Sequence, residues 1–223
     1  MSGIDIENEK SGLVPTKAWK KRVKKEKWHE GETLSVAIGQ GFNLTTPLQI
    51  CAMTAAISNG GKLYQPKVVE RVTDPDGNIV ERFKPTLVRR IDRFNAYYPI
   101  IRAGMKAVVH GKKGTARDVK IEGITIGGKT GTAQVVKVAQ YKHLKEEDIP
   151  YKYRDHAWFT CYAPAENPEI AVTVLVEHGL HGGSGAGPIA RAVLKKYFEK
   201  RLAVIAAEKA EMEIVGGQEN VEN

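Results

Sequence analysis

The chain has 223 residues, 42% of them hydrophobic and 27% charged, which is the composition of an ordinary globular protein. No apolar run reaches the roughly 18 residues of a membrane span, and the first residues do not resemble a secretory signal. The net charge of +8 favours an acidic partner, such as nucleic acid, an anionic membrane face or a cell-wall polymer.

The first distinctive segment is basic. Lysine and arginine dominate residues 17–27, and Trp19 and Trp28 bracket most of them. Cations interleaved with aromatic rings are one way to bind nucleic acid. A solvated basic face is the commoner meaning of such a run, so we do not expect a nucleic-acid partner.

A helix is predicted to start at Thr46-Pro47-Leu48-Gln49. Threonine can cap the first turn, proline suits the first helical position, and glutamine can reach back to the cap. Asn59-Gly60-Gly61 is predicted to end this helix. Residues 64–72 and 79–83 then flank a turn that contains Pro75 and Gly77, which predicts a β-hairpin.

A second, amphipathic helix is predicted over residues 94–110. Its apolar positions recur every three or four residues, which is the period of a helix face. These positions are Phe94, Tyr97, Ile101, Met105 and Val108.

The stretch from Ile124 to Val136 is the most informative part of the chain. It places Lys129, Thr130, Gly131 and Thr132 between β-branched residues, which favours a strand. On an edge strand the glycine would leave room for a substrate backbone, and the lysine and threonines would hold a carboxylate. Main-chain N–H groups would face a developing oxyanion.

Two alternatives compete with that interpretation. Gly123 to Thr130 matches G-x-x-x-x-G-K-T, the phosphate-binding P-loop of a nucleotide-binding protein. A P-loop needs a buried strand before it and a helix that starts at its Lys-Thr, whereas residues 119–122 are a poor buried strand and residues 132–138 are strand-like. The other alternative is a hairpin without chemistry.

The rest of the chain predicts a small antiparallel sheet. Residues 139–155 form a long polar loop, and residues 157–163 and 170–177 are two strands in meander order, with Lys129 at the sheet edge. A glycine-rich turn, residues 182–188, leads into a last helix, and residues 206–223 are predicted to form a disordered tail. The residues of this helix predicted to pack inward are Ile189, Val193, Tyr197 and Leu202.

No metal or cofactor is expected. His178 and His181 are three residues apart but have no obvious third ligand, and neither Cys51 nor Cys161 has a second cysteine at metal-ligand spacing. Both cysteines lie in apolar company, which favours buried free thiols over a disulfide.

Four short motifs follow one another in an order that resembles a known family. They are Ile38-Gly39-Gln40-Gly41, Thr46-Pro47-Leu48-Gln49, Gly114-Thr115-Ala116 and Lys129-Thr130-Gly131-Thr132-Ala133-Gln134. In this order they resemble the transpeptidase domain of class B penicillin-binding proteins. Residues 28–33 contain a tryptophan followed by glycine, acid and threonine, which resembles the cell-elongation type, penicillin-binding protein 2.

The resemblance implies an α+β, penicillin-recognising, β-lactamase-like fold, with helices that flank an antiparallel sheet. It implies a peptidoglycan D,D-transpeptidase, which attacks the D-Ala-D-Ala end of a stem peptide through a serine acyl-enzyme and is blocked by β-lactams. It also implies cell-elongation complex proteins as partners. The implied location is the periplasmic face of the inner membrane, with the membrane anchor outside this chain.

The resemblance assigns one part of a site on this sequence. Lys129 is the catalytic candidate and would supply positive charge near the substrate carboxylate, which Thr130 and Thr132 would hydrogen-bond. Gly131 would leave the strand open to the substrate main chain, and the Thr132 N–H would be one oxyanion donor.

Two other motifs of the family do not occur here. No serine has a lysine three residues later, and none begins Ser-x-Asn or Ser-x-Asp. We therefore interpret residues 1–205 as the C-terminal portion of the domain, without the half that carries the nucleophile, and expect no acylation by this chain alone. The sheet near Val135, Phe159 and Val174 is expected to lack cover, which would favour self-association. A noncatalytic module that binds cell-wall peptide or a partner protein would lack the same motifs.

Overall fold

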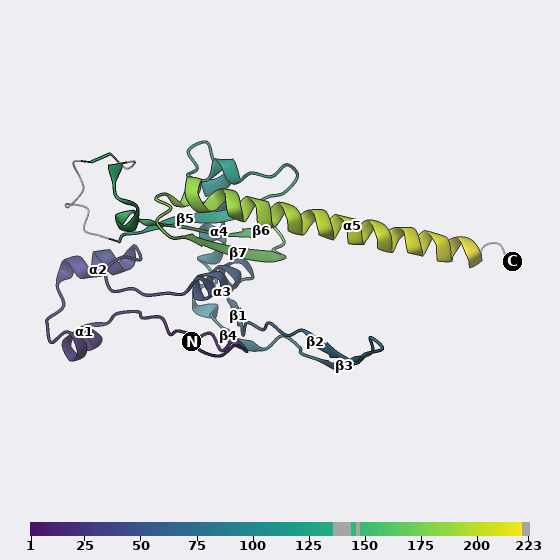
Figure 1. The fold of residues 1–223 in the computed structure, drawn as a ribbon, viewed down its shortest axis with the longest axis horizontal. Helices are drawn as coiled ribbons and strands as arrows, with labels where there is room; N and C mark the ends of the chain where they lie inside the picture. The colour runs from purple at the N-terminus through teal and green to yellow at the C-terminus, as the bar shows by residue number, and fades with distance from the viewer. Residues whose placement is uncertain (136–143, 146–147, 220–223) are drawn as a thin grey trace.

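The computed structural model describes residues 1–135, 144–145 and 148–219 (Figure 1). Its centre is an antiparallel sheet of β5 (Gly127–Ala133), β6 (His156–Ala163) and β7 (Ile170–Val176), in the order β5-β6-β7. The predicted meander is therefore confirmed, with β5 at one edge. The strand predicted over residues 132–138 is too long, because β5 ends at Ala133 and Gln134 and Val135 are not strand. Residues 136–138 lie outside the described residues.

Helices cover both faces of this sheet (Figure 1). Successive side chains of a strand point to opposite faces, so neighbouring residues of β6 contact different helices. On one face Phe159 packs in a core with Leu194 of α5 (Gly187–Glu219). On the other face the Thr160 hydroxyl lies 2.8 Å from the Thr54 hydroxyl of α3 (Pro47–Ser58). The expectation that Phe159 lacks cover is wrong, since its side chain is 0% exposed.

Helix α3 begins and ends where the sequence predicts. The Thr46 hydroxyl accepts a hydrogen bond from the Gln49 N–H (3.2 Å), and the Gln49 side-chain oxygen accepts one from the Thr46 N–H (3.0 Å). These two bonds form a capping box, which satisfies N–H groups that a helix start otherwise leaves unpaired. Asn59 follows the last residue of the helix.

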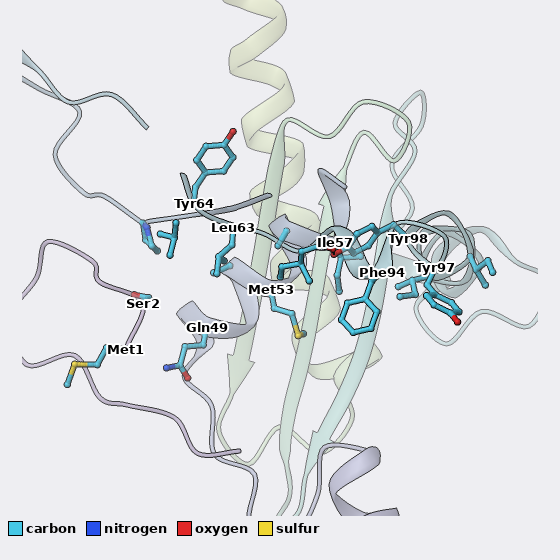
Figure 2. A pocket seen from close by; sticks show the side chains of 17 residues that line it. Met1, Ser2, Gln49, Met53, Ile57, Leu63, Tyr64, Phe94, Tyr97 and Tyr98 are labelled. Carbon is cyan, nitrogen blue, oxygen red and sulfur yellow. The ribbon is translucent and has the colours of Figure 1, made fainter. Parts of the chain in front are cut away.

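Helix α4 (Tyr98–His110) starts later than predicted, after a separate turn, η1 (Asp92–Phe94). On the predicted apolar face, Met105 is buried, but Phe94, Tyr97 and Ile101 are 40%, 58% and 41% exposed. These three residues line an apolar cavity of about 860 Å³ that α3, α4, β1 (Lys62–Tyr64) and β4 (Leu87–Arg90) border (Figure 2). Uncovered apolar surface therefore lies at this cavity.

The predicted hairpin exists, but its first strand is shorter than expected. β2 (Arg71–Thr73) pairs with β3 (Ile79–Arg82) around the predicted turn. Tyr64 belongs instead to β1, which pairs antiparallel with β4, a strand that the sequence analysis missed. Pro66 lies between β1 and β2 and has no N–H to donate to a partner strand, which interrupts the predicted strand.

Helix α5 follows a π-helical turn, η6 (Gly182–Ala186), and runs well past the sheet (Figure 1). Ala190 and Leu194 are buried against the sheet, on the helix face that residues four apart share. Small alanines let this helix approach the strands closely. Three residues predicted to pack inward are instead exposed: Ile189 (47%), Val193 (43%) and Leu202 (67%). The predicted disordered tail, residues 206–223, overlaps α5 as far as Glu219, and its disorder stays a prediction. Residues 220–223 lie outside the described residues.

Two short helices, α1 (Lys17–Val23) and α2 (Glu30–Ala37), precede α3. Within the basic segment Lys20 is not solvated, because its side chain is 2% exposed and its Nζ lies 2.6 Å from the Glu32 carboxylate of α2. A second carboxylate, that of Glu26, lies 3.4 Å from the same nitrogen. The Lys20–Glu32 ion pair joins α1 to α2, and the Lys20–Glu26 pair joins α1 to the connection between them.

Two further short turns among the described residues are η2 (Arg117–Val119) and η5 (Tyr151–Tyr153). Cys51 and Cys161 are free thiols, as the sequence predicts, and burial raises the pKa of Cys161 to about 12. Within residues 1–135, 144–145 and 148–219, no helix has both the length and the apolar character to cross a membrane.

Candidate functional site

Lys129, Thr130, Gly131 and Thr132 lie on β5, the edge strand of the sheet. Among the strands of the described residues, β5 pairs only with β6, and Gly131 stands opposite Trp158. Lys129 and Thr132 are exposed, whereas Thr130 and Gly131 are half-buried. The other side of β5 is therefore a sheet edge to which an extended peptide can add.

Two side chains show which backbone groups of β5 face this edge. The Lys129 Nζ donates to the Thr130 carbonyl oxygen (2.6 Å), and the Gln40 Nε2 donates to the Thr132 carbonyl oxygen (3.0 Å). In an antiparallel strand, alternate residues turn both their N–H and their C=O away from the paired neighbour. The Thr132 N–H therefore points to the open edge, where it can donate to a ligand that lies along the strand.

The side chains of these residues lie on two faces of the strand. Thr130 and Thr132 share one face, and Lys129 and Gly131 share the other, because side chains alternate along a strand. A ligand that lies along the edge can contact both faces. The ammonium and the hydroxyls would therefore approach one carboxylate from opposite sides.

Two of the short sequence motifs meet on β5. Gln40, from residues 38–41, reaches the Thr132 carbonyl, and the Thr115 hydroxyl, from residues 114–116, lies 3.1 Å from the Thr130 hydroxyl. A third motif caps α3, whose Thr54 contacts β6. The order of these motifs is visible in the sequence, but the contacts of Gln40 and Thr115 with the strand were not predicted.

The glycine-rich turn η6 packs on β5, a contact that was not predicted from the sequence. A Cβ on Gly182 would lie 2.1 Å from the Trp158 carbonyl oxygen and 2.7 Å from that of Gly131. A Cβ on Gly183 would lie 2.4 Å from the Thr115 carbonyl oxygen. Only glycine lets the backbone cross the strands this closely, so the run of glycines was the available signal.

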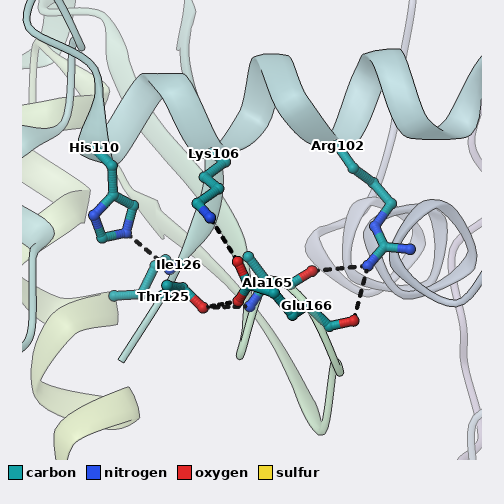
Figure 3. A network of polar contacts seen from close by, with 7 residues as sticks. All are labelled: Arg102, Lys106, His110, Thr125, Ile126, Ala165 and Glu166. Carbon is teal, nitrogen blue, oxygen red and sulfur yellow. Dashed lines mark hydrogen bonds and ion pairs between the residues drawn. The ribbon is translucent and has the colours of Figure 1, made fainter. Parts of the chain in front are cut away.

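A network of polar side chains holds the residues that precede β5 (Figure 3). Arg102, Lys106 and His110 are spaced by four residues and point from one face of α4. The Arg102 guanidinium donates to the Ala165 carbonyl (2.7 Å), and the Lys106 Nζ lies 2.5 Å from the Glu166 carboxylate. The Thr125 hydroxyl also donates to that carboxylate. The network thus joins α4 to the β6–β7 turn and to the start of β5.

The charges of this network are fixed at neutral pH. The Lys106 ammonium, and then the Thr125 hydroxyl, lower the pKa of Glu166 to about 2. Burial, and then the charges of Lys120 and Lys106, lower the pKa of His110 from its ordinary value of 6.5. His110 is therefore neutral, as it must be for its Nε2 to accept a hydrogen bond from the Ile126 N–H (2.9 Å).

The His110 contact predicts a pH-dependent stability. A lowered folded-state pKa means that the contact stabilises the fold above pH 6.5 and that this stabilisation is lost as the pH falls through the lowered pKa. We expect the melting temperature to fall more from pH 7.5 to pH 5 in the wild type than in His110→Gln, whose amide oxygen accepts without titrating. Thermal denaturation at both pH values measures this difference, and equal falls would contradict it. The Glu166 carboxylate stays ionised over this range.

The structure also bears on the other sequence hypotheses. A P-loop requires a helix that starts at Lys129-Thr130, but residues 127–133 form a strand. The His178 ring packs against the rings of Tyr151, in a tilted geometry, and His156, in an edge geometry, with centroids 4.8 Å apart in each pair. Within the described parts of the chain, no group of three His, Cys, Asp or Glu residues is placed to hold a metal ion.

Comparison with known proteins gives one consistent result. Residues 1–195 match the penicillin-binding protein transpeptidase domain. The chain is 35% identical, over 204 residues, to the peptidoglycan D,D-transpeptidase MrdA of Haemophilus influenzae, a match that covers 90% of this chain and 31% of the relative. It is 39% identical over 185 residues to MrdA of Acinetobacter baumannii, which covers 83% of this chain and 27% of that protein.

Solved structures agree with the sequence matches. Penicillin-binding protein 2 of Helicobacter pylori, in its complex with MreC, is 36% identical and superposes with a TM-score of 0.72 over 89% of this chain and 33% of that one. The chain thus spans about a third of the length of its relatives. The predicted penicillin-binding fold is confirmed. The chain belongs to the transpeptidase domain family of class B penicillin-binding proteins, of the type of penicillin-binding protein 2 and MrdA.

Proposed function

We propose that this chain forms the substrate-binding part of a peptidoglycan D,D-transpeptidase, in which the open edge of β5 binds the D-Ala-D-Ala end of a stem peptide. Lys129, Thr130 and Thr132 hold the terminal carboxylate, and Gly131 leaves room for the peptide backbone. The Thr132 N–H stabilises the oxyanion that forms when a serine attacks the substrate carbonyl. β-Lactams bind at the same edge.

The observation that carries this proposal is the convergence on β5. Gln40 and Thr115 come from two separate motifs, and both hydrogen-bond to the Lys-Thr-Gly-Thr strand. A hairpin without chemistry gives no reason for distant polar side chains to meet on an edge strand. The outward direction of the Thr132 N–H adds the donor that acyl transfer requires.

The nucleophile, in this proposal, is a serine outside these 223 residues, because no serine of the chain begins Ser-x-x-Lys. The chain alone is then inactive. We also propose that the protein works with cell-elongation complex proteins, since the Helicobacter pylori relative forms a complex with MreC. Its proposed location is the periplasmic face of the inner membrane.

Intact-mass spectrometry after incubation with benzylpenicillin tests the proposal. We expect no adduct on the 223-residue chain and one stoichiometric adduct on a form extended upstream through the whole transpeptidase domain. An adduct on the short chain would place a nucleophile within these residues. If neither form reacts, the transpeptidase proposal fails, and binding of a D-Ala-D-Ala peptide without acylation would point to a noncatalytic module.

A further inference from the structure

Gln40 makes a side-chain hydrogen bond to the candidate site, and the family resemblance of residues 38–41 gives no function for this bond. Its side-chain Nε2 donates to the carbonyl oxygen of Thr132, a residue 92 positions away in the chain. This carbonyl faces the open edge of β5, where a ligand backbone would lie. The contact therefore sits directly beside the Thr132 N–H, the proposed oxyanion donor.

The loop that carries Gln40 is held in place on both sides. Gly39 and Gly41 have φ angles of +79° and +73°, a left-handed conformation that glycine adopts without strain. The Gln40 N–H donates to the Ser35 carbonyl (2.9 Å), and the Asn43 amide donates to the Gln40 carbonyl (3.2 Å). The backbone of Gln40 is thus fixed, and its side chain is aimed at β5.

β5 needs such support because an edge strand has one neighbour. Gly131, which precedes Thr132 on this strand, lacks a Cβ, so its backbone has more intrinsic conformational freedom than that of Thr130 or Thr132. The peptide unit between Gly131 and Thr132 carries the Thr132 N–H. A hydrogen bond to the Thr132 carbonyl restrains the other side of the same residue, and so limits how far this N–H can turn.

We propose that Gln40 is a positioning residue that keeps the Thr132 N–H aimed at the reacting carbonyl. The proposal rests on the function proposed above. A carbonyl oxygen has two lone pairs, so Gln40 stays bonded while a ligand N–H uses the second one. Gln40 acts through Thr132 and contacts no reacting atom. Its loss is therefore expected to slow acylation more than it weakens β-lactam binding.

The first arm of the test uses the 223-residue chain. In Gln40→Ala, two-dimensional NMR should show a shifted Thr132 amide resonance and faster hydrogen exchange of that amide. Gln65→Ala is the matched control, because the Gln65 Nε2 also donates to a backbone carbonyl, that of Gly3, away from β5. A Thr132 amide that is unchanged in Gln40→Ala, relative to Gln65→Ala, would overturn the proposal without any measurement of activity.

The second arm uses the extended form and follows the rate of benzylpenicillin acylation. Loss of one neutral hydrogen bond predicts a limiting acylation rate about 3- to 10-fold lower in Gln40→Ala, with little change in the half-saturating concentration. Gln65→Ala should react like the wild type. An unreactive wild type would refute the proposed function, whereas a reactive wild type with an equally fast Gln40→Ala would refute the positioning role alone.

Gln40→Glu separates positioning from a general loss of packing. At pH 7 its carboxylate cannot donate, and it repels the Thr132 carbonyl, so acylation should be at least as slow as in Gln40→Ala. Near pH 4, around the ordinary glutamate pKa of about 4.3, the protonated carboxyl can donate again. The rate of Gln40→Glu relative to the wild type should then rise while that of Gln40→Ala does not. Parallel pH profiles of the two variants, or acylation faster than wild type in either, would overturn the proposal.

Discussion

Replacing Gly182 with alanine is expected to destabilise this chain strongly. The new Cβ would lie 2.1 Å from the Trp158 carbonyl oxygen and within 2.9 Å of the Gly131 backbone nitrogen. Both contacts involve backbone atoms of paired strands, which cannot move without separating β5 from β6 or displacing η6. Overpacking of this kind costs about 3 kcal/mol, which lowers the melting temperature by roughly 6–12 °C in a chain of this length.

Thermal denaturation followed by circular dichroism measures this loss. Gly104→Ala is the matched control, because Gly104 lies inside α4 and a Cβ there would meet no atom within 4 Å. Alanine also favours the helix, so this variant should gain about 0.5–1 kcal/mol. A Gly182→Ala chain that melts with the wild type would show that η6 does not pack on the strands as described.

Replacing Lys129 with alanine is expected to slow β-lactam acylation of the extended form by about 10- to 100-fold. The proposed role of this ammonium is a charge-assisted hydrogen bond to the ligand carboxylate, and such bonds contribute about 1.5–3 kcal/mol. The side chain is exposed, and its described hydrogen bond goes to the neighbouring Thr130 carbonyl. Its removal should therefore change the free energy of unfolding by no more than about 0.5 kcal/mol.

Lys129→Ala is thus expected to lower the acylation rate without lowering the free energy of unfolding. Replacing a residue with a structural role would lower the free energy of unfolding. Stopped-flow acylation and a thermal melt on the same preparation measure both quantities. Lys129→Arg is the control, because it keeps the positive charge and should lose less activity. Wild-type acylation by Lys129→Ala would remove this residue from the site.

The features that the sequence predicted are those with local causes. The start of α3 depends on a threonine, a proline and a glutamine within four positions, and its capping box forms among those residues. The strands β6 and β7 follow from short apolar runs between turn residues, rich in aromatic residues in β6 and in β-branched residues in β7. The choice of Lys129 to Thr132 as site residues came from their chemistry between β-branched residues and from the family resemblance, and it stays a prediction. The edge position of their strand, β5, is confirmed.

The features that the sequence did not predict depend on distant partners. On α5, the large aliphatic residue Val193 suggested one buried face, but the sheet is so close that Ala190 fits and Val193 stays 43% exposed. The contacts of Arg102 and Lys106 on α4 with the β6–β7 turn could not be predicted, because charged residues on a helix usually face water. The Gln40 and Thr115 contacts with β5 join segments whose approach no local pattern encodes.

The hydrogen bonds that complete β5 and its sheet join residues far apart in the chain. Gln40 and Thr132 are 92 positions apart, and Thr54 and Thr160 are 106 positions apart. The entropy of closing such loops must be overcome before the contacts stabilise anything, so structures rich in them fold slowly. We therefore expect the Gln40 loop to reach β5 late in folding. Until then, the unpaired edge of β5 is exposed on a partly folded chain, where another strand can pair with it and begin aggregation.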